Sequence, residues 1–149
     1  MELLKKTAVQ MREALLKKEV SAVELVEESY KRVDNVEDKI GAYNSLTKEY
    51  ALETAKKVDE KIAKGENLPK MAGIPLALKD NINLKGFKTT ASSKILENFV
   101  SPYDATVSKK LRENLVPVIG KANLDEFAMG SSNENSAFKK VHNPHNLNK

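Results

Sequence analysis

The hydrophobic pattern changes near residue 70, and this change constrains the fold more than any other feature of the sequence. Up to about Glu66, apolar residues recur three or four positions apart, which is the spacing of one face of an α-helix. After a short polar connection that contains Pro69, apolar residues gather in compact runs bounded by glycine and charge. Such runs are typical of strands buried on both faces. The sequence therefore predicts helices first and an α/β arrangement afterwards.

Three helices are expected in the first part of the chain. Their apolar stripes are Leu4-Ala8-Met11-Leu15, Ala22-Val26-Tyr30-Val33 and Ala51-Ala55-Val58-Ile62. Ser21 and Glu24 have the spacing of a capping box, in which each residue binds the backbone N–H of the other. Gly65 stands where a glycine commonly follows a helix. We expect the stripes to face a core rather than a ligand.

The second part is predicted to alternate strands and helices. The expected order is a strand within Gly73–Asp80, a helix capped by Asp104 that carries Val107 and Leu111, a strand at Leu115–Ile119, and a short helix that Asn123 and Glu126 open and Gly130 ends. Strand, helix, strand and helix in this order indicate an α/β layer with parallel pairing. Two or three strands do not make a sheet with both faces covered, and the chain stops in polar loop sequence. We therefore expect the front of a longer protein.

Composition excludes several classes of protein. The chain has no cysteine, which removes disulfide scaffolds and thiolate chemistry. No apolar run approaches the ~20 residues of a membrane helix, and the N-terminus lacks a secretory signal, so we expect a cytoplasmic protein. The net charge of +4 is carried by scattered lysines, and aromatic residues make up only 5%. Direct nucleic-acid binding is therefore not expected.

Apparent motifs for phosphate binding, metal binding and nucleophilic catalysis lack the residues or spacing that these functions require. Gly120-Lys121 resembles the end of a phosphate loop, but that motif needs an earlier glycine where Leu115 stands and Ser or Thr where Ala122 stands. His142 and His145 lie in a proline-containing loop without a nearby carboxylate, which favours a surface pair over a metal site. Ser131, Ser132 and Ser136 lack the setting of a nucleophile.

Lys79 is the main candidate for chemistry. It follows the apolar run Ile74–Leu78, so it is predicted to lie at the carboxyl end of a strand, where catalytic groups of α/β sheets gather. A lysine that loses its proton can act as a base, and burial promotes that loss. The alternative is a structural lysine that extends to water or pairs with Asp80.

The segment around Lys79 resembles a known family. Gly73–Asn81 looks like the lysine-bearing strand of the amidase signature family. Thr89–Ser92, Tyr103–Thr106 and Gly120-Lys121 follow in the family's order. Asn123–Ser132 and Glu134–Phe138 are similar to a narrower branch, the glutaminase subunits of the Glu-tRNA(Gln) amidotransferases. The resemblance covers nearly the whole chain.

The resemblance implies a fold and a site. Residues 1–149 would be the N-terminal part of a single amidase domain, with a helical front at 1–66 and the first part of a mixed, helix-covered α/β core at 73–149. Lys79 would be the base of a Ser-Ser-Lys triad whose two serines come after Lys149, so this segment alone would be inactive. Met129, Gly130 and Ser131 would line the substrate pocket. The alternative for this turn is that Phe127 and Met129 are core residues.

The resemblance also implies a reaction and partners. Glutamine would be the amide, and the freed ammonia would pass to a partner that uses ATP and Mg to amidate Glu-tRNA(Gln), a ligase reaction of protein biosynthesis. The partners would be subunits B and C of a heterotrimer, with no membrane and no cofactor bound by this segment. Two alternatives stay open: another amidase of the family that acts on a different small amide, or a non-catalytic module that binds a partner through its helical front.

Overall fold

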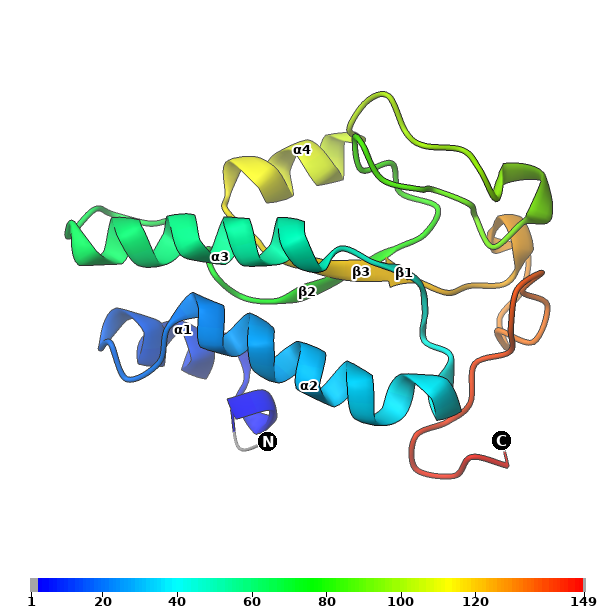
Figure 1. Cartoon of the computed structure of the whole chain (residues 1–149), viewed down its shortest axis with the longest axis horizontal. Helices are drawn as coiled ribbons and strands as arrows, with labels where there is room; N and C mark the ends of the chain where they lie inside the picture. The colour runs from blue at the N-terminus through cyan, green and yellow to red at the C-terminus, as the bar shows by residue number, and fades with distance from the viewer. Residues whose placement is uncertain (1–2, 149) are drawn as a thin grey trace. The chain divides into compact units, whose positions relative to one another are not determined.

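The computed structural model describes residues 3–148 (Figure 1). The main elements are α1 (Ala8–Leu16), α2 (Ala22–Ile40), β1 (Tyr43–Leu46), α3 (Lys48–Ala63), β2 (Leu76–Lys79), α4 (Thr106–Glu113) and β3 (Val118–Ala122), with short 3₁₀ turns at Leu3–Lys5, Lys94–Leu96 and Glu126–Ala128. The strands form a mixed sheet in the order β1-β3-β2, which confirms the predicted α/β class. Within these residues no helix is long and apolar enough to cross a membrane.

The described residues form two compact units. One comprises the residues up to Val33 together with Thr47–Leu76 and Lys110–Ile119. The other comprises Asp34–Leu46, Ala77–Lys109 and the residues from Gly120 onward. The division into a helical front and an α/β core at residues 66–73 stays a prediction.

Two of the three predicted helical stripes are buried in the first unit, whereas in the stripe predicted for α1 only Leu15 is buried and Ala8 is exposed. The stripe of α2 is buried throughout, and so are Ala51, Ala55 and Val58 of α3. The predicted capping box is present, since Ser21 N–H donates to Glu24 Oε2 at 2.8 Å and Glu24 N–H donates to Ser21 Oγ at 3.1 Å. Burial of these stripes stabilises the helices more than their intrinsic propensity does.

Two glycines of this unit adopt backbone conformations that side chains disfavour. Gly65 follows α3 with φ +71°, and the next N–H, of Glu66, donates back to Lys61 C=O at 3.0 Å, as expected of a helix end. Gly73 has φ +78° and lies against the core, where an added Cβ would come within 3.1 Å of Ala22 and Leu15. Only the second position combines a left-handed backbone with close packing.

The second unit contains the paired part of the sheet. β1 and β3 are antiparallel, with Tyr43 opposite Ala122 and Leu46 opposite Gly120. β2 joins the other side of β3 through Asp80 N–H, which donates to Ala122 C=O at 2.9 Å. Gly120 allows the close approach of β1, because a Cβ there would lie 2.7 Å from the Tyr43 ring.

Several sequence predictions about elements are wrong. β1 was not predicted and lies inside the stretch expected to be helical. β3 begins at Val118, so Pro117 precedes the strand instead of interrupting it, and its C=O accepts from Leu76 N–H. β2 is buried on one face only, since Ala77 and Lys79 are exposed.

The predicted helix starts and core positions near the end of the chain also need correction. Asn123 does not cap a helix, because its side-chain amide donates to the C=O groups of Gly41 and Lys139. Only a 3₁₀ turn forms at Glu126–Ala128. Phe127, which the alternative interpretation of this turn placed in the core, is 43% exposed.

Candidate functional site

Lys79 lies at the carboxyl end of β2, where its position in the sequence predicted it. Side chains alternate along this strand, so Leu78 and Asp80 point into the protein while Ala77 and Lys79 are exposed. Within residues 3–148 the ammonium of Lys79 has no hydrogen-bond or ion-pair partner. The alternative in which Lys79 pairs with Asp80 is therefore wrong.

Asp80 pairs with Lys121 of β3 instead. Asp80 Oδ1 lies 3.1 Å from Lys121 Nζ, and both side chains are fully buried. The other carboxylate oxygen accepts hydrogen bonds from Asn44 Nδ2, at 2.9 Å, and from the Thr90 hydroxyl. Two buried charges require such compensation, since an isolated ion in the interior costs several kcal/mol.

Lys121 is the residue of this site that sequence inspection missed. Its Nζ also donates to Lys88 C=O and to Thr89 Oγ1, both at 3.0 Å. Burial lowers the pKa of Lys121, while the charge and hydrogen bond of Asp80 oppose that shift. Because Lys121 is enclosed on all sides, it serves the structure of the site rather than reaching a substrate.

Ser92 extends the buried polar network toward the end of the chain. Its hydroxyl accepts from Asn44 Nδ2 at 2.8 Å and donates to Asn123 Oδ1 at 2.9 Å. Ala91 and Ser92 both have positive φ, +49° and +53°, a strained arrangement for residues with side chains. Hydrogen bonds from β1 and β3 compensate this strain, because Asn44 of β1 binds Ser92 and Lys121 of β3 binds Thr89.

Asp125 organises the turn that holds the predicted pocket residues. Its carboxylate accepts the N–H groups of Asn135 and Asn133, both at 2.9 Å, and these hydrogen bonds lower the pKa of Asp125. Gly130 lies so close that a Cβ there would be 2.5 Å from this carboxyl group. Met129 is 76% exposed, so it does not belong to the core formed by the described residues.

Backbone hydrogen bonds connect this turn to the end of β2. Ala91 N–H donates to Asp80 C=O at 3.0 Å, and Ala91 C=O accepts from Phe127 N–H at 2.9 Å. Ala91 thus connects Asp80, the residue after Lys79, with Phe127, two residues before Met129. That Met129, Gly130 and Ser131 line a substrate pocket remains a prediction.

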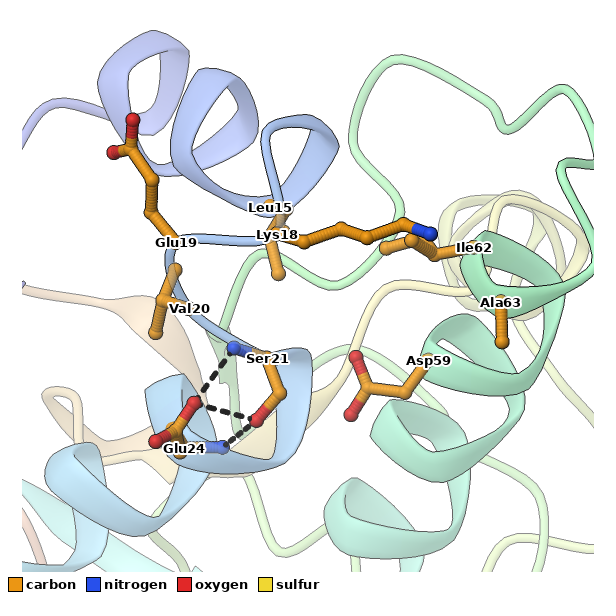
Figure 2. A pocket seen from close by; sticks show the side chains of 9 residues that line it. All are labelled: Leu15, Lys18, Glu19, Val20, Ser21, Glu24, Asp59, Ile62 and Ala63. Carbon is orange, nitrogen blue, oxygen red and sulfur yellow. Dashed lines mark hydrogen bonds between the residues drawn. The ribbon is translucent and has the colours of Figure 1, made fainter.

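A hollow of about 430 Å³ lies in the other unit, at the start of α2 (Figure 2). The carboxylates of Glu24 and Asp59 lie on either side of Ser21. Glu24 accepts from the N–H of Ser21, just before α2, and Asp59 accepts from the N–H groups of the first two residues of the helix. Leu15, Val20 and Ile62 provide its apolar lining. Because the carboxylates cap α2, they serve the helix end, and the hollow contains none of the predicted site residues.

Metal-binding side chains do not gather in the part of the chain that the structure describes. Among residues 3–148 no group of three His, Asp or Glu side chains is arranged to hold an ion. His142 Nδ1 lies 3.1 Å from Leu147 C=O, and His145 is exposed.

Comparison with known proteins identifies the family. The model of the Amidase family matches residues 24–149, and the chain belongs to this family. Among curated relatives, the A subunit of glutamyl-tRNA(Gln) amidotransferase from Clostridium novyi is 52% identical over 147 residues, which are 99% of this chain and 30% of the relative. The corresponding protein of Thermoanaerobacter pseudethanolicus is also 52% identical, over 149 residues. The chain spans about 30% of the length of these relatives.

Solved structures agree with this assignment. The crystal structure of the A subunit of glutamyl-tRNA(Gln) amidotransferase from Thermotoga maritima is 38% identical, with a TM-score of 0.66 over 98% of this chain and 27% of that one. A chain from a vestigial protein complex that reveals the origins of an s-triazine catabolic enzyme is 31% identical, with a TM-score of 0.91. The matched region covers 95% of this chain and 31% of the chain from that complex.

Proposed function

We propose that this chain forms the lysine-bearing part of the glutaminase subunit of a Glu-tRNA(Gln) amidotransferase. The observation that carries the proposal is the free ammonium of Lys79 at the end of β2, beside an aspartate already neutralised by Lys121. The curated amidotransferase relatives, about half identical over the whole chain, support the choice of reaction. The complete protein, not these 149 residues alone, would carry the activity.

The proposed chemistry is amide hydrolysis by an activated serine. Lys79, in its neutral form, takes a proton from a bridging serine, which takes the proton of the nucleophilic serine. The nucleophile bonds to the carboxamide carbon of glutamine, the proton held by Lys79 returns through the bridging serine to the amide nitrogen, and the C–N bond breaks to release ammonia. Water then breaks the acyl bond and releases glutamate. Both serines lie outside this chain, so residues 1–149 alone are expected to release no ammonia from glutamine.

Lys79 is the better candidate for the base than Lys121. A base must come within hydrogen-bond reach of the proton that it takes. Lys121 is fully buried and committed to Asp80, Lys88 and Thr89, whereas Lys79 is exposed and unpartnered within the described residues. Loss of a proton from lysine is promoted by burial, so the proposal requires the rest of the amidase domain to cover Lys79.

The proposal extends to the complex. Ammonia would pass to a partner protein that activates Glu-tRNA(Gln) with ATP and Mg, and subunits B and C would complete a cytoplasmic heterotrimer. On this proposal the chain itself binds none of the cofactors of that second reaction. Their role is the release of ammonia.

The test is a chimera in which this chain replaces the matching 147 residues of the Clostridium novyi relative, assembled with that organism's partner subunits. The chimera is expected to hydrolyse glutamine. Lys79→Ala and Lys79→Arg should abolish ammonia release, because guanidinium stays protonated and alanine has no base. Amidation driven by added ammonium salt should continue. Lys57→Ala, at an exposed lysine of α3, is the control for loss of a surface charge.

A second candidate is a hydrolase of another small amide. It is favoured by the TM-score of 0.91 to the chain related to s-triazine catabolism, against 0.66 to the Thermotoga protein. A chimera that cleaves simple aliphatic or aromatic amides faster than glutamine would support this candidate. Normal glutamine hydrolysis by the Lys79→Ala chimera would refute both catalytic proposals and favour a module that only binds a partner.

A further inference from the structure

We infer that the buried Asp80–Lys121 ion pair positions Lys79 and keeps its ammonium free of a carboxylate partner. This inference rests on the proposed role of Lys79 as a base. Asp80 is the next residue in the chain and has the carboxylate closest to Lys79 in sequence. The Asp80 carboxylate lies on the buried face of β2, where its Oδ1 is 3.1 Å from Lys121 Nζ. It is therefore not available to Lys79.

The first argument is the fixation of the strand end. Asp80 N–H donates to Ala122 C=O at 2.9 Å, and Asp80 C=O accepts from Ala91 N–H at 3.0 Å. Its carboxylate contacts Lys121, Asn44 and Thr90 at the same time. The residue that follows Lys79 is therefore held through both its backbone and its side chain, which sets the direction in which the lysine leaves the strand.

The second argument is electrostatic. Asp80 has no access to water, so without Lys121 its charge would be buried and uncompensated. Because Lys79 and Asp80 face opposite sides of β2, this carboxylate would reach the ammonium of Lys79 only if the strand end came away from β3. A lysine paired with a carboxylate is held in its protonated form and is a poor base. Lys121 thus prevents a competing ion pair that would remove the base from the reaction.

The third argument is the placement of Lys121 itself. Its Nζ donates to Lys88 C=O and Thr89 Oγ1, both at 3.0 Å, so its own position is fixed by the loop that leads to Thr90. It cannot follow Asp80 if the strand end rotates. The Asp80–Lys121 ion pair therefore holds the end of β2 in one position.

The experiment measures kcat and KM for glutamine hydrolysis by the chimera, at a temperature well below each variant's melting temperature. Lys121→Met is expected to lower kcat about ten- to a hundredfold, as for a misplaced catalytic group, with KM for glutamine changed less than about twofold. Adding Asp80→Asn to Lys121→Met removes the carboxylate that captures Lys79. That double variant should recover kcat to within about threefold of the unchanged chimera.

Val58→Ala is the matched control, because Val58 is a buried residue of α3 in the other unit, outside the segment that carries Lys79. It should lower the melting temperature and leave kcat unchanged. A folded Lys121→Met chimera with normal kcat would overturn the inference, and so would a double variant as slow as the single one.

Lys121→Gln takes the place of Lys121→Met if the latter does not fold, with the same expected values. If neither folds, the ion pair is purely structural and the inference is wrong. Failure of the proposed function is distinguishable, since it appears as normal turnover by Lys79→Ala. This inference alone fails when Lys79→Ala is inactive and Lys121→Met is fully active.

Discussion

Replacement of Gly73 by alanine provides a direct test of the packing in the first unit. The added Cβ would lie 3.0 Å from Val58 Cγ1, 3.1 Å from Ala22 Cβ and 3.1 Å from Leu15 Cδ1. These atoms come from α3, α2 and α1, so the three helices meet at this point in the core. All three neighbours are buried, and none is the free end of a flexible polar side chain.

The expected cost has a backbone part and a packing part. A left-handed conformation costs a residue with a side chain about 1–2 kcal/mol. Insertion of a methyl group into a filled core costs about 1–3 kcal/mol more. Gly73→Ala should therefore lower the free energy of unfolding by about 2–5 kcal/mol. Gly65 has nearly the same φ as Gly73, and an added Cβ there would have nothing within 4 Å. Gly65→Ala should therefore lower the free energy of unfolding only by the backbone part.

The assay is urea-induced unfolding of the 149-residue chain, followed by far-ultraviolet circular dichroism for the unchanged chain and both variants. Equal slopes against urea would show that the variants unfold with the same change in exposed surface. The difference between the two variants then measures the packing part alone. Equal losses at both positions would refute the proposal that α1, α2 and α3 pack tightly around Gly73.

Two further predictions concern single polar side chains. The pKa of Asp125 is lowered by hydrogen bonds from Asn135 and Asn133, so its contribution to stability is present above the pKa of an unfolded carboxyl and is lost as the pH falls through the lowered value. The protection factors for amide hydrogen exchange at Asn133 and Asn135, which compare the observed rate with the intrinsic rate at the same pH, should fall over that acidic range, and Asp125→Asn should remove the dependence. Arg12 donates to the C=O groups of residues 68–70, so Arg12→Lys, which lacks the planar fork, should cost about 1–2 kcal/mol and speed proteolysis of that loop.

The helices were the part of the fold that the sequence predicted well. Their signals are local: the stripe of α2, the capping box at Ser21 and Glu24, and the glycine after α3 all act within one or two turns of the chain. A pattern that is complete within a few residues does not depend on the rest of the fold. The structure therefore confirms it with little change.

The missed features depend on residues far apart in the sequence. β1 has only four residues and is a strand because it pairs with β3. Asn123 has the spacing of a helix cap, but the C=O groups of Gly41 and Lys139 occupy its amide. The buried role of Lys121 was not predicted, because its partner, Asp80, lies far away in the sequence. Local spacing contains none of this information.

In the candidate site, too, the features set by local sequence were predicted and those set by distant residues were not. The place of Lys79 at a strand end followed from the apolar run before it, and the structure confirms that place. Its proposed role, and the roles of Met129 to Ser131, came from the family resemblance and stay predictions. The buried network that holds Asp80 became visible only with the fold.

The alternation of exposed and buried residues in β2 makes the length of this segment more critical than most of its residue identities. Lys79 and Asp80 are adjacent and face opposite sides of the sheet, so the two positions have separate tasks. Deletion of one residue between Gly73 and Leu78, with the pairing to β3 retained before it, would exchange their sides. The lysine would then face Lys121 in the interior, and the carboxylate would face solvent. We therefore expect this segment to accept many apolar exchanges and to reject any single-residue insertion or deletion.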